Sequence, residues 1–273
     1  MTTQQIIEKL QFQYGQDFSV YATSFLRNAL GIRVKETGLP GLNSYLDFIA
    51  QDNDELKKLT NSLHINYSLF FRNLLDTSLF ECCILPELIQ SKEKYNSRSF
   101  RMWSVGCAEG PEPYSFAMLA DKVISDRQCE IPVMVFGTDI SSAALDKARE
   151  GTYGEQAMQN VKLSFLDRFF VLNQTQYSVK NHIKNQVYFS EGDIIDPCYN
   201  SPPAAIFADF DLVSCCNLMI YYQQEIQQKI LEKLHRSLAQ NGYLLVGESE
   251  RLIVEKFGKF RKLYPLGNVF IRK

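Results

Sequence analysis

The segment Arg101–Ser115 constrains the fold of this 273-residue chain more than any other. Its apolar first part reaches Gly106, a second glycine stands at position 110, and a helical pattern begins near Glu112. A strand that passes through a glycine turn into a helix brings bare backbone close to a bound ligand. The segment therefore predicts an α/β fold with a ligand site at the end of this strand.

A second strand indicates which class of ligand fits this turn. The run Val133–Asp139 has the pattern of a strand that ends in an acid. In a strand–helix–strand unit, an acid at this place accepts hydrogen bonds from ribose hydroxyls. The glycines do not follow the G-x-G-x-x-G spacing, which disfavours a dinucleotide-dependent dehydrogenase. Two structural alternatives stay open, because Asp139 could cap a helix that begins at Ser141 and Glu112 could simply favour a helix dipole.

Composition excludes several other classes of protein. The net charge of −2, from 29 basic and 31 acidic residues, gives no general attraction to nucleic acid or to an anionic membrane. The N-terminus lacks the pattern of a signal peptide, and no apolar run approaches the ~20 residues of a membrane span. Seven cysteines without a C-x-x-C spacing and three separated histidines predict no metal site. We therefore expect a cytoplasmic protein without a bound metal, a nucleic-acid partner or an inserted membrane segment.

The chain divides into a helical part and an α/β part. Residues 1–90 show apolar positions at three- and four-residue steps, which predicts an all-helical N-terminal domain. Residues 91–100 are polar and turn-rich, as expected of a linker. From 101 to 273, strand patterns alternate with helical ones, which indicates a mostly parallel sheet with covered faces. Short strand-like runs within 168–189 predict a small antiparallel insertion in that sheet.

Ligands of an open α/β sheet bind beyond the carboxyl ends of its strands. The informative strand ends lie at Gly106–Glu112, Asp139, Asp193 and Cys216–Asn217. Taken singly, the polar residues near these ends have structural interpretations as well. Asn217 could cap a turn, while Tyr221 and the aromatic segment Ser68–Arg72 could be ordinary packing.

As a set, six segments resemble the CheR-type chemoreceptor glutamate methyltransferases in their order and spacing. They are Ile65–Arg72, Arg101–Ser115, Phe136–Ile140, Leu166–Phe170, Val213–Tyr221 and Gly242–Glu250. The helical pattern that precedes them fits the N-terminal domain of that family. The resemblance implies a Rossmann-like class I methyltransferase sheet with a small antiparallel β-subdomain insertion and an N-terminal all-helical domain.

The resemblance also implies a cofactor and an acceptor. The cofactor is S-adenosylmethionine, and the acceptors are glutamate side chains in the cytoplasmic domains of methyl-accepting chemoreceptors. The implied cofactor-binding residues are Asn66, Ser68, Arg72, Gly106, Glu112, Asp139, Asp193, Ile194, Cys216 and Asn217. Within this set, Arg72 corresponds to a position near the methionine carboxylate and Asp139 to one at the ribose. Tyr221 matches the tyrosine beside the reactive methyl group and is the predicted catalytic residue of an enzyme that we expect to be monomeric.

The chain departs from the family pattern at several positions. Cys216 stands where the family usually has an arginine, whose charge and forked donors a thiol does not replace. Asp193 replaces the usual asparagine, and the helix before Gly38 keeps few of the basic residues that dock relatives onto receptors. These departures leave two alternatives open: a cofactor-binding protein without catalysis, and a methyltransferase with a different acceptor. The short turns within 168–189 fit the branch that does not bind a receptor tail peptide.

Overall fold

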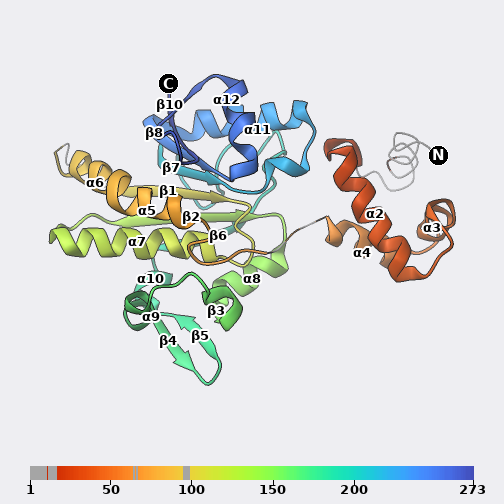
Figure 1. The fold of residues 1–273 in the computed structure, drawn as a ribbon, viewed down its shortest axis with the longest axis horizontal. Coiled ribbons are helices and arrows are strands. Elements are labelled where there is room, and N and C mark those ends of the chain that lie inside the picture. The colour runs from red at the N-terminus through yellow and green to blue at the C-terminus, as the bar shows by residue number, and fades with distance from the viewer. Residues whose placement is uncertain (1–10, 12–16, 64, 66, 95–98) are drawn as a thin grey trace. The chain divides into compact units, whose positions relative to one another are not determined.

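A computed structural model describes residues 11, 17–63, 65, 67–94 and 99–273. The chain forms two compact units, Met1–Ile65 with Leu218–Gln228 and Asn66–Asn217 with Lys229–Lys273 (Figure 1). This division differs from the expected domain boundary near residue 90. The helices between residues 74 and 94 belong to the second unit, because Phe80, Ile84 and Ile89 are buried in the same apolar cluster as the first strand of the sheet.

The first unit is helical, as predicted. Its main helices are α2 (Thr23–Thr37), α3 (Leu42–Ile49) and α4 (Asn53–Ser62), preceded by the 3₁₀ turn η1 (Phe18–Val20). Apolar side chains from all three helices are buried together, among them Leu26, Leu30, Tyr45, Leu46, Ile49 and Leu59. The carboxylate of Asp52 accepts hydrogen bonds from the first backbone N–H groups of α4 and so begins this helix.

A later segment of the chain completes the first unit. The backbone N–H of Ala22 donates to the carbonyl of Tyr221 at 2.8 Å, and the ring of Tyr21 stacks on Tyr222 with centroids 5.6 Å apart. The 3₁₀ turn η4 (Met219–Tyr221) therefore belongs with the N-terminal helices. Tyr221 is thus a member of the helical unit rather than of the sheet.

The second unit is built on a seven-stranded sheet of order β6-β2-β1-β7-β8-β10-β9. Its strands are β1 (Phe100–Val105), β2 (Val133–Asp139), β6 (Val187–Glu191), β7 (Phe210–Cys215), β8 (Leu238–Val246), β9 (Phe260–Lys262) and β10 (Val269–Arg272). The first five in spatial order pair in parallel, and β10 pairs antiparallel with β8 and β9. Every residue of β1 and β7 is buried, as expected for central parallel strands that are covered on both faces.

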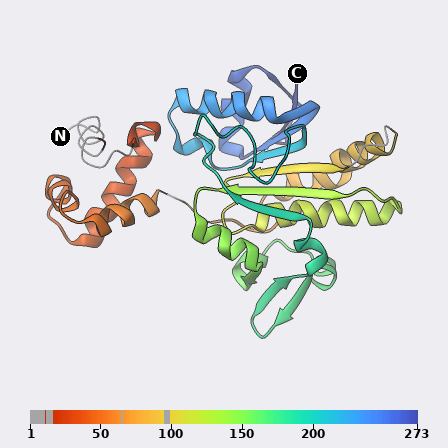
Figure 2. The same ribbon diagram turned by 180° about the vertical axis from the view of Figure 1, so that it is seen from behind.

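Helices and connections cover the two faces of this sheet. On one face lie α5 (Leu74–Leu79), the π-helical turn η2 (Phe80–Ile84), α6 (Leu85–Lys94) and α7 (Pro111–Arg127). Met102 points to this face, whereas Trp103 points to the other and packs against Phe210 and Tyr199. Figure 2 shows the connection from β6 to β7 running over that second face. Other helices of the unit are α8 (Ser142–Glu150), α12 (Arg251–Phe257) and the part of α11 (Gln224–Ser237) that follows Gln228.

The predicted insertion is present, but its strands differ from those expected. The small antiparallel sheet has the order β3-β5-β4, with β3 (Thr152–Gly154), β4 (Phe170–Asn173) and β5 (Gln176–Val179). The run near residue 187, expected to belong to it, is β6 of the main sheet instead. Val187 pairs there with Val135 of β2. The third strand of the small sheet is β3, which precedes the turn η3 (Glu155–Met158) and α9 (Leu163–Phe169), and α10 (Asn181–Lys184) follows β5.

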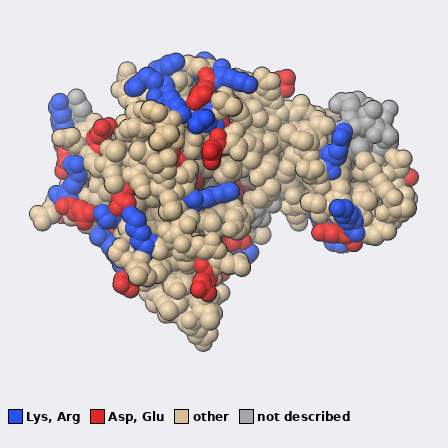
Figure 3. Space-filling model, in the orientation of Figure 1, with Lys and Arg blue, Asp and Glu red and all other residues tan. Residues whose placement is uncertain are grey.

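Charges of both signs are spread over the visible surface of the second unit, with lysine and arginine gathered over α12 and the C-terminal strands (Figure 3). Residues 256–273 contain six basic residues and no acid. Ion pairs of Lys259 with Glu232 and of Lys262 with Glu255 offset part of this charge. No helix in the described part of the chain is both long and apolar enough to cross a membrane.

Candidate functional site

The turn after β1 has an unusual backbone. Gly106, Ala108 and Gly110 all have positive φ angles, of 66°, 50° and 93°. Glycine adopts this left-handed region without the steric cost that other residues bear. A Cβ atom at Gly110 would also come within 2.9 Å of the Cβ of Ala148. The turn therefore brings bare backbone to the carboxyl edge of the sheet, and Pro111 then starts α7 as a favoured first helical residue.

Asp139, at the end of β2, connects this turn to the next helix. Its Oδ2 accepts a hydrogen bond from the N–H of Ala108 at 2.9 Å, and its Oδ1 accepts one from the N–H of Ser141 at 2.9 Å. The residue that caps α8 is Ser141, whose hydroxyl accepts from the N–H of Ala144. Asp139 is therefore not the helix cap. Because an ionised carboxylate has about four acceptor sites, two remain available for ribose hydroxyls.

Glu112, in the first turn of α7, is a partly buried acid of the site. Its Oε1 accepts a hydrogen bond from the hydroxyl of Ser104 at 2.6 Å. Burial raises the pKa of the Glu112 carboxyl, while hydrogen bonds from Ser104, Ser214 and Cys216 and the charge of Arg72 act in the opposite direction. Burial is the largest of these effects, so the pKa of Glu112 lies above its ordinary value despite the neutral donors and the one cation around the carboxylate.

Cys216 lies next to this acid. Its Sγ is 3.3 Å from the hydroxyl oxygen of Ser214. Burial and then the negative charge of Glu112 raise the pKa of the Cys216 thiol well above its usual range, so the thiol stays neutral at physiological pH. Cys216 therefore adds no charge to the site.

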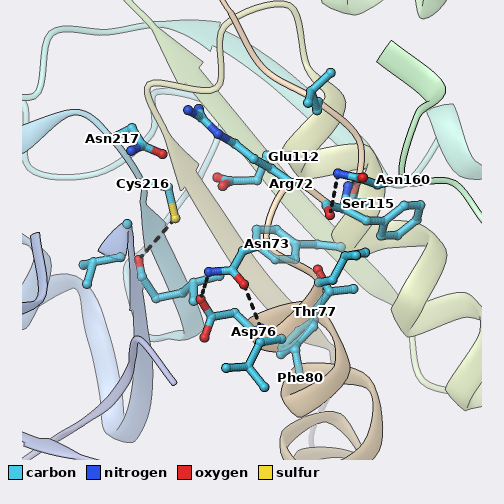
Figure 4. A pocket seen from close by; sticks show the side chains of 18 of the residues that line it. Arg72, Asn73, Asp76, Thr77, Phe80, Glu112, Ser115, Asn160, Cys216 and Asn217 are labelled. Atoms are coloured by element: carbon cyan, nitrogen blue, oxygen red, sulfur yellow. Dashed lines mark hydrogen bonds between the residues drawn. The ribbon is translucent and has the colours of Figure 1, made fainter. Parts of the chain in front are cut away.

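Several of these side chains point into a cavity (Figure 4), whose volume is about 520 Å³. Among the described residues that line it, Arg72 is the one arginine or lysine, and the carboxylates come from Asp76, Glu112 and Glu248. Asp76 is buried and already accepts hydrogen bonds from the N–H and the Nδ2 of Asn268, at 2.8 and 2.9 Å. Arg72 and Glu112 are therefore a pair of opposite charges in one cavity.

Asn217, at the end of β7, contributes to the same cavity. Its backbone has a φ of 58°, and its N–H donates to Oε2 of the buried Glu250 at 2.7 Å. The same oxygen accepts from the N–H of Gly247 at 2.8 Å. Glu250 therefore ties the ends of β7 and β8 together, while the side chain of Asn217 faces the cavity.

The remaining predicted residues are distributed as follows. The Oδ1 of Asp193 accepts from the N–H of Ile195 at 3.0 Å, and Lys233 donates to the carbonyl of Ile194 at 2.6 Å, which holds the turn after β6. Ser68 is half-buried, and Asn66 lies outside the described residues. Tyr221 belongs to the helical unit, where its ring centroid is 4.6 Å from that of Phe25, and its catalytic role stays a prediction.

The structure thus brings Arg72, Glu112, Cys216 and Asn217 to one cavity and joins Asp139 to the glycine turn. Sequence reasoning did not single out the supporting residues Ser104, Ser214 and Glu250. The two serines are register partners at the ends of β1 and β7. The sequence does show a serine near the end of each of these apolar strands. Because a hydroxyl in a buried strand needs a hydrogen-bonding partner, these serines could have indicated a polar residue of the site nearby.

The comparisons with known proteins give the family. Residues 66–264 match the profile described as "CheR methyltransferase, SAM binding domain", and residues 1–64 match "CheR methyltransferase, all-alpha domain". The chain belongs to the CheR methyltransferase family and carries its S-adenosylmethionine-binding domain.

Named relatives agree with this assignment. A chemotaxis protein methyltransferase of Borreliella burgdorferi is 27% identical, over 90% of this chain and 87% of that protein. One of Escherichia coli is 30% identical, over 82% of this chain and 74% of that protein. An uncharacterized 104.1 kDa protein of Rhodobacter capsulatus is 29% identical over 91% of this chain, which spans 25% of that longer protein.

The side chains of the site fit S-adenosylmethionine chemically. The methionine part of the cofactor carries an ammonium and a carboxylate, and the cavity offers the opposite charges of Glu112 and Arg72. Asp139 has acceptor sites left for ribose hydroxyls, and the left-handed turn after β1 lets a ligand approach the backbone closely.

Within the described residues, no group of three or more His, Cys, Asp or Glu is placed to hold a metal ion.

Proposed function

We propose that this protein transfers a methyl group from S-adenosylmethionine to glutamate side chains in the cytoplasmic domains of chemoreceptors. The main support for S-adenosylmethionine as the cofactor is that Arg72 and Glu112 line one cavity at the carboxyl edge of the sheet. The acceptor half is supported by the relatives that are named chemotaxis protein methyltransferases. We propose further that the enzyme acts in the cytoplasm, where these receptor domains lie, and that it acts as a monomer.

Each predicted site residue has a role in this proposal. Arg72 binds the methionine carboxylate and Glu112 the ammonium, while Asp139 accepts hydrogen bonds from the ribose. Gly106 lets the backbone approach the cofactor. Asp193 and Ile194 border the adenine, and Asn66 and Ser68 also contact the cofactor. Cys216 and Asn217 line the cavity beside Glu112.

The reaction asks little of acids and bases. When bound, S-adenosylmethionine supplies a methyl group that is already activated by its sulfonium. A glutamate carboxylate is ionised at pH 7, so the protein needs no base to generate the nucleophile. The protein contributes orientation of the two reactants and removal of water from the carboxylate. We assign the orientation of the acceptor carboxylate to Tyr221.

The experiment uses the purified full chain, tritiated methyl donor and membranes that contain chemoreceptors. Methyl esters are cleaved by mild base, so base-labile radioactivity in the receptor band is the expected result. Radioactivity that resists base, or label in proteins other than receptors, would contradict the proposed acceptor. Absence of S-adenosylmethionine binding in calorimetry would contradict the cofactor half.

A second candidate function is a regulatory protein that binds the cofactor without transferring its methyl group. The observation that favours it is the neutral, partly buried thiol of Cys216 beside Glu112, where the family usually has an arginine. This candidate predicts tight cofactor binding and no labelled receptor in the same assay.

A third candidate, methylation of a different acceptor, is favoured by the charges of α2. Arg33, one of the few basic residues on this helix, is held by Glu55 at 2.8 Å. Its charge is therefore less available to an acidic partner. Labelling of a non-receptor protein in a whole-cell extract would support this candidate.

Because position 216 carries a neutral cysteine instead of an arginine, we expect a particular pH dependence of cofactor affinity. Binding of the cofactor ammonium needs ionised Glu112, so affinity falls as the pH falls through the raised pKa of this carboxyl. In Cys216→Arg, a cation beside Glu112 lowers that pKa, and we expect the fall in S-adenosylhomocysteine affinity to occur at lower pH. Calorimetric titrations between pH 4 and pH 8 measure the shift. The matched control is Cys82→Arg at an exposed cysteine, and an equal shift there would argue against a local effect.

A further inference from the structure

Phe71, the residue before Arg72, has a strained backbone that is fixed on both sides. Its φ is 51°, in the left-handed region that residues with a Cβ rarely adopt. Its N–H donates to the hydroxyl oxygen of Ser115 at 3.1 Å. Its carbonyl accepts from Nδ2 of Asn160 at 3.3 Å. A strained residue keeps such a conformation only where its surroundings hold it.

Ser115 links this residue to the helix that carries Glu112. It lies one turn further along α7, and its hydroxyl donates to the carbonyl of Pro111 at 2.7 Å. That donation leaves the oxygen free to accept from Phe71. The backbone before Arg72 is thus attached to the first turns of the helix that holds the opposite charge of the site.

Asn160 links the same residue to the connection between η3 and α9. It lies between η3 and α9, and its side chain lines the cavity beside Ser115 (Figure 4). The neighbouring Phe70 packs edge-on against Tyr153 of β3 and Phe170 of β4, with centroids 4.9 and 5.2 Å away. Phe71 packs in the same way on Phe165 of α9, at 5.2 Å. The small sheet and its helix therefore form one wall against the segment that ends in Arg72.

We propose that Ser115 and Asn160 are positioning residues that direct Arg72 toward the cofactor carboxylate by fixing the left-handed turn at Phe71. The inference rests on the proposed function, in which Arg72 binds that carboxylate. Neither residue touches the carboxylate in this arrangement. Each acts through the backbone of Phe71, Ser115 from α7 and Asn160 from the connection between η3 and α9.

The test compares two ligands that differ at the carboxylate alone. S-adenosylmethionine has this group, and decarboxylated S-adenosylmethionine lacks it. For Asn160→Ala and Ser115→Ala we expect about tenfold weaker binding of the first ligand, the size of effect that one lost hydrogen bond to a charged group produces. Binding of the decarboxylated ligand, measured by competition, should change less than about twofold. Ser115→Thr retains the hydroxyl and should restore most of the affinity.

Matched controls separate positioning from general damage. Asn173→Ala removes an exposed amide of the same small sheet, and Ser237→Ala removes a buried serine that bonds within its own helix. Both should leave the ratio of the two affinities unchanged. A melting curve for each variant shows whether it is folded. If Ser115→Ala is not folded, the affinities of Asn160→Ala for the two ligands test the proposal.

A double-mutant cycle gives an independent readout. If Asn160 acts through Arg72, then Asn160→Ala should have no further effect on S-adenosylmethionine affinity in an Arg72→Ala background. Additive effects, or equal losses for both ligands, would overturn the positioning role. Failure of the wild-type chain to bind S-adenosylmethionine at all would instead remove the proposed function, and the two failures are therefore distinguishable.

Discussion

Replacing Glu112 by glutamine is expected to weaken S-adenosylmethionine binding by roughly 10- to 100-fold and, at neutral pH, to stabilise the ligand-free protein. The affinity loss follows from removing the charged partner of the ammonium, because hydrogen bonds to charged groups contribute about 1.5–3 kcal/mol. A tenfold change in affinity corresponds to about 1.4 kcal/mol. Isothermal calorimetry with S-adenosylmethionine measures this half of the prediction.

The stability gain follows from the raised pKa of Glu112. Burial holds this pKa above its ordinary value of 4.5, so the folded protein binds the proton more tightly than the unfolded chain does. The carboxyl therefore contributes stability that increases as the pH falls through the raised pKa and is lost again as the pH rises. A glutamine avoids the cost of a buried charge at every pH. The melting temperature of ligand-free Glu112→Gln should exceed that of the wild type at pH 7.5, and the difference should shrink near pH 4.

The matched control is Glu109→Gln in the turn before α7. Glu109 forms an ion pair with Lys147 at 2.6 Å on the surface, and such pairs contribute about 0–1 kcal/mol. This variant should change the free energy of cofactor binding and the free energy of unfolding by less than about 1 kcal/mol each. A Glu112→Gln protein that melts lower than the wild type at pH 7.5, or that binds the cofactor equally well, would show that this carboxylate has another role.

The parts of the fold that were predictable have strong local signals. The strand, glycine turn and helix of Arg101–Ser115 appear as β1, the left-handed turn and α7. In contrast, β3 is only three residues long and follows directly on the glycine that ends α8. Its partner β5 lies more than twenty residues later. A strand of that length has no alternation to recognise, and its pairing is decided by tertiary structure.

The boundary between the units was missed for a related reason. The helices of residues 74–94 have the same apolar periodicity as those of the first unit, and periodicity does not reveal which core a helix joins. The site shows the same limit. Polar residues at strand ends could be found, whereas Ser115 and Asn160 could not, because they contact Phe71 from 44 and 89 residues away. Only the folded chain brings such partners together.

The second large effect is expected from Gly110→Ala in the turn after β1. The left-handed backbone at this residue costs an alanine about 1–2 kcal/mol. The new Cβ would also lie 2.9 Å from the Cβ of Ala148 and 3.0 Å from the ring of Phe189, and such overpacking typically costs about 1–3 kcal/mol. We therefore expect a loss of about 2–5 kcal/mol in the unfolding free energy of the second unit. Urea denaturation with hydrogen exchange on the amides of α7 measures it.

Gly31→Ala in α2 is the matched control, with the opposite expected sign. Gly31 lies inside a helix, and a Cβ there would meet no atom within 4 Å. Alanine is favoured over glycine in a helix by about 0.5–1 kcal/mol, so exchange of the α2 amides should become slower by a corresponding factor. The same chemical change thus stabilises one unit and destabilises the other. The turn at Gly110 also holds the N–H of Ala108 against Asp139, so Gly110→Ala should weaken cofactor binding as well. A variant that is less stable but binds the cofactor normally would show that the turn does not contribute to ribose binding.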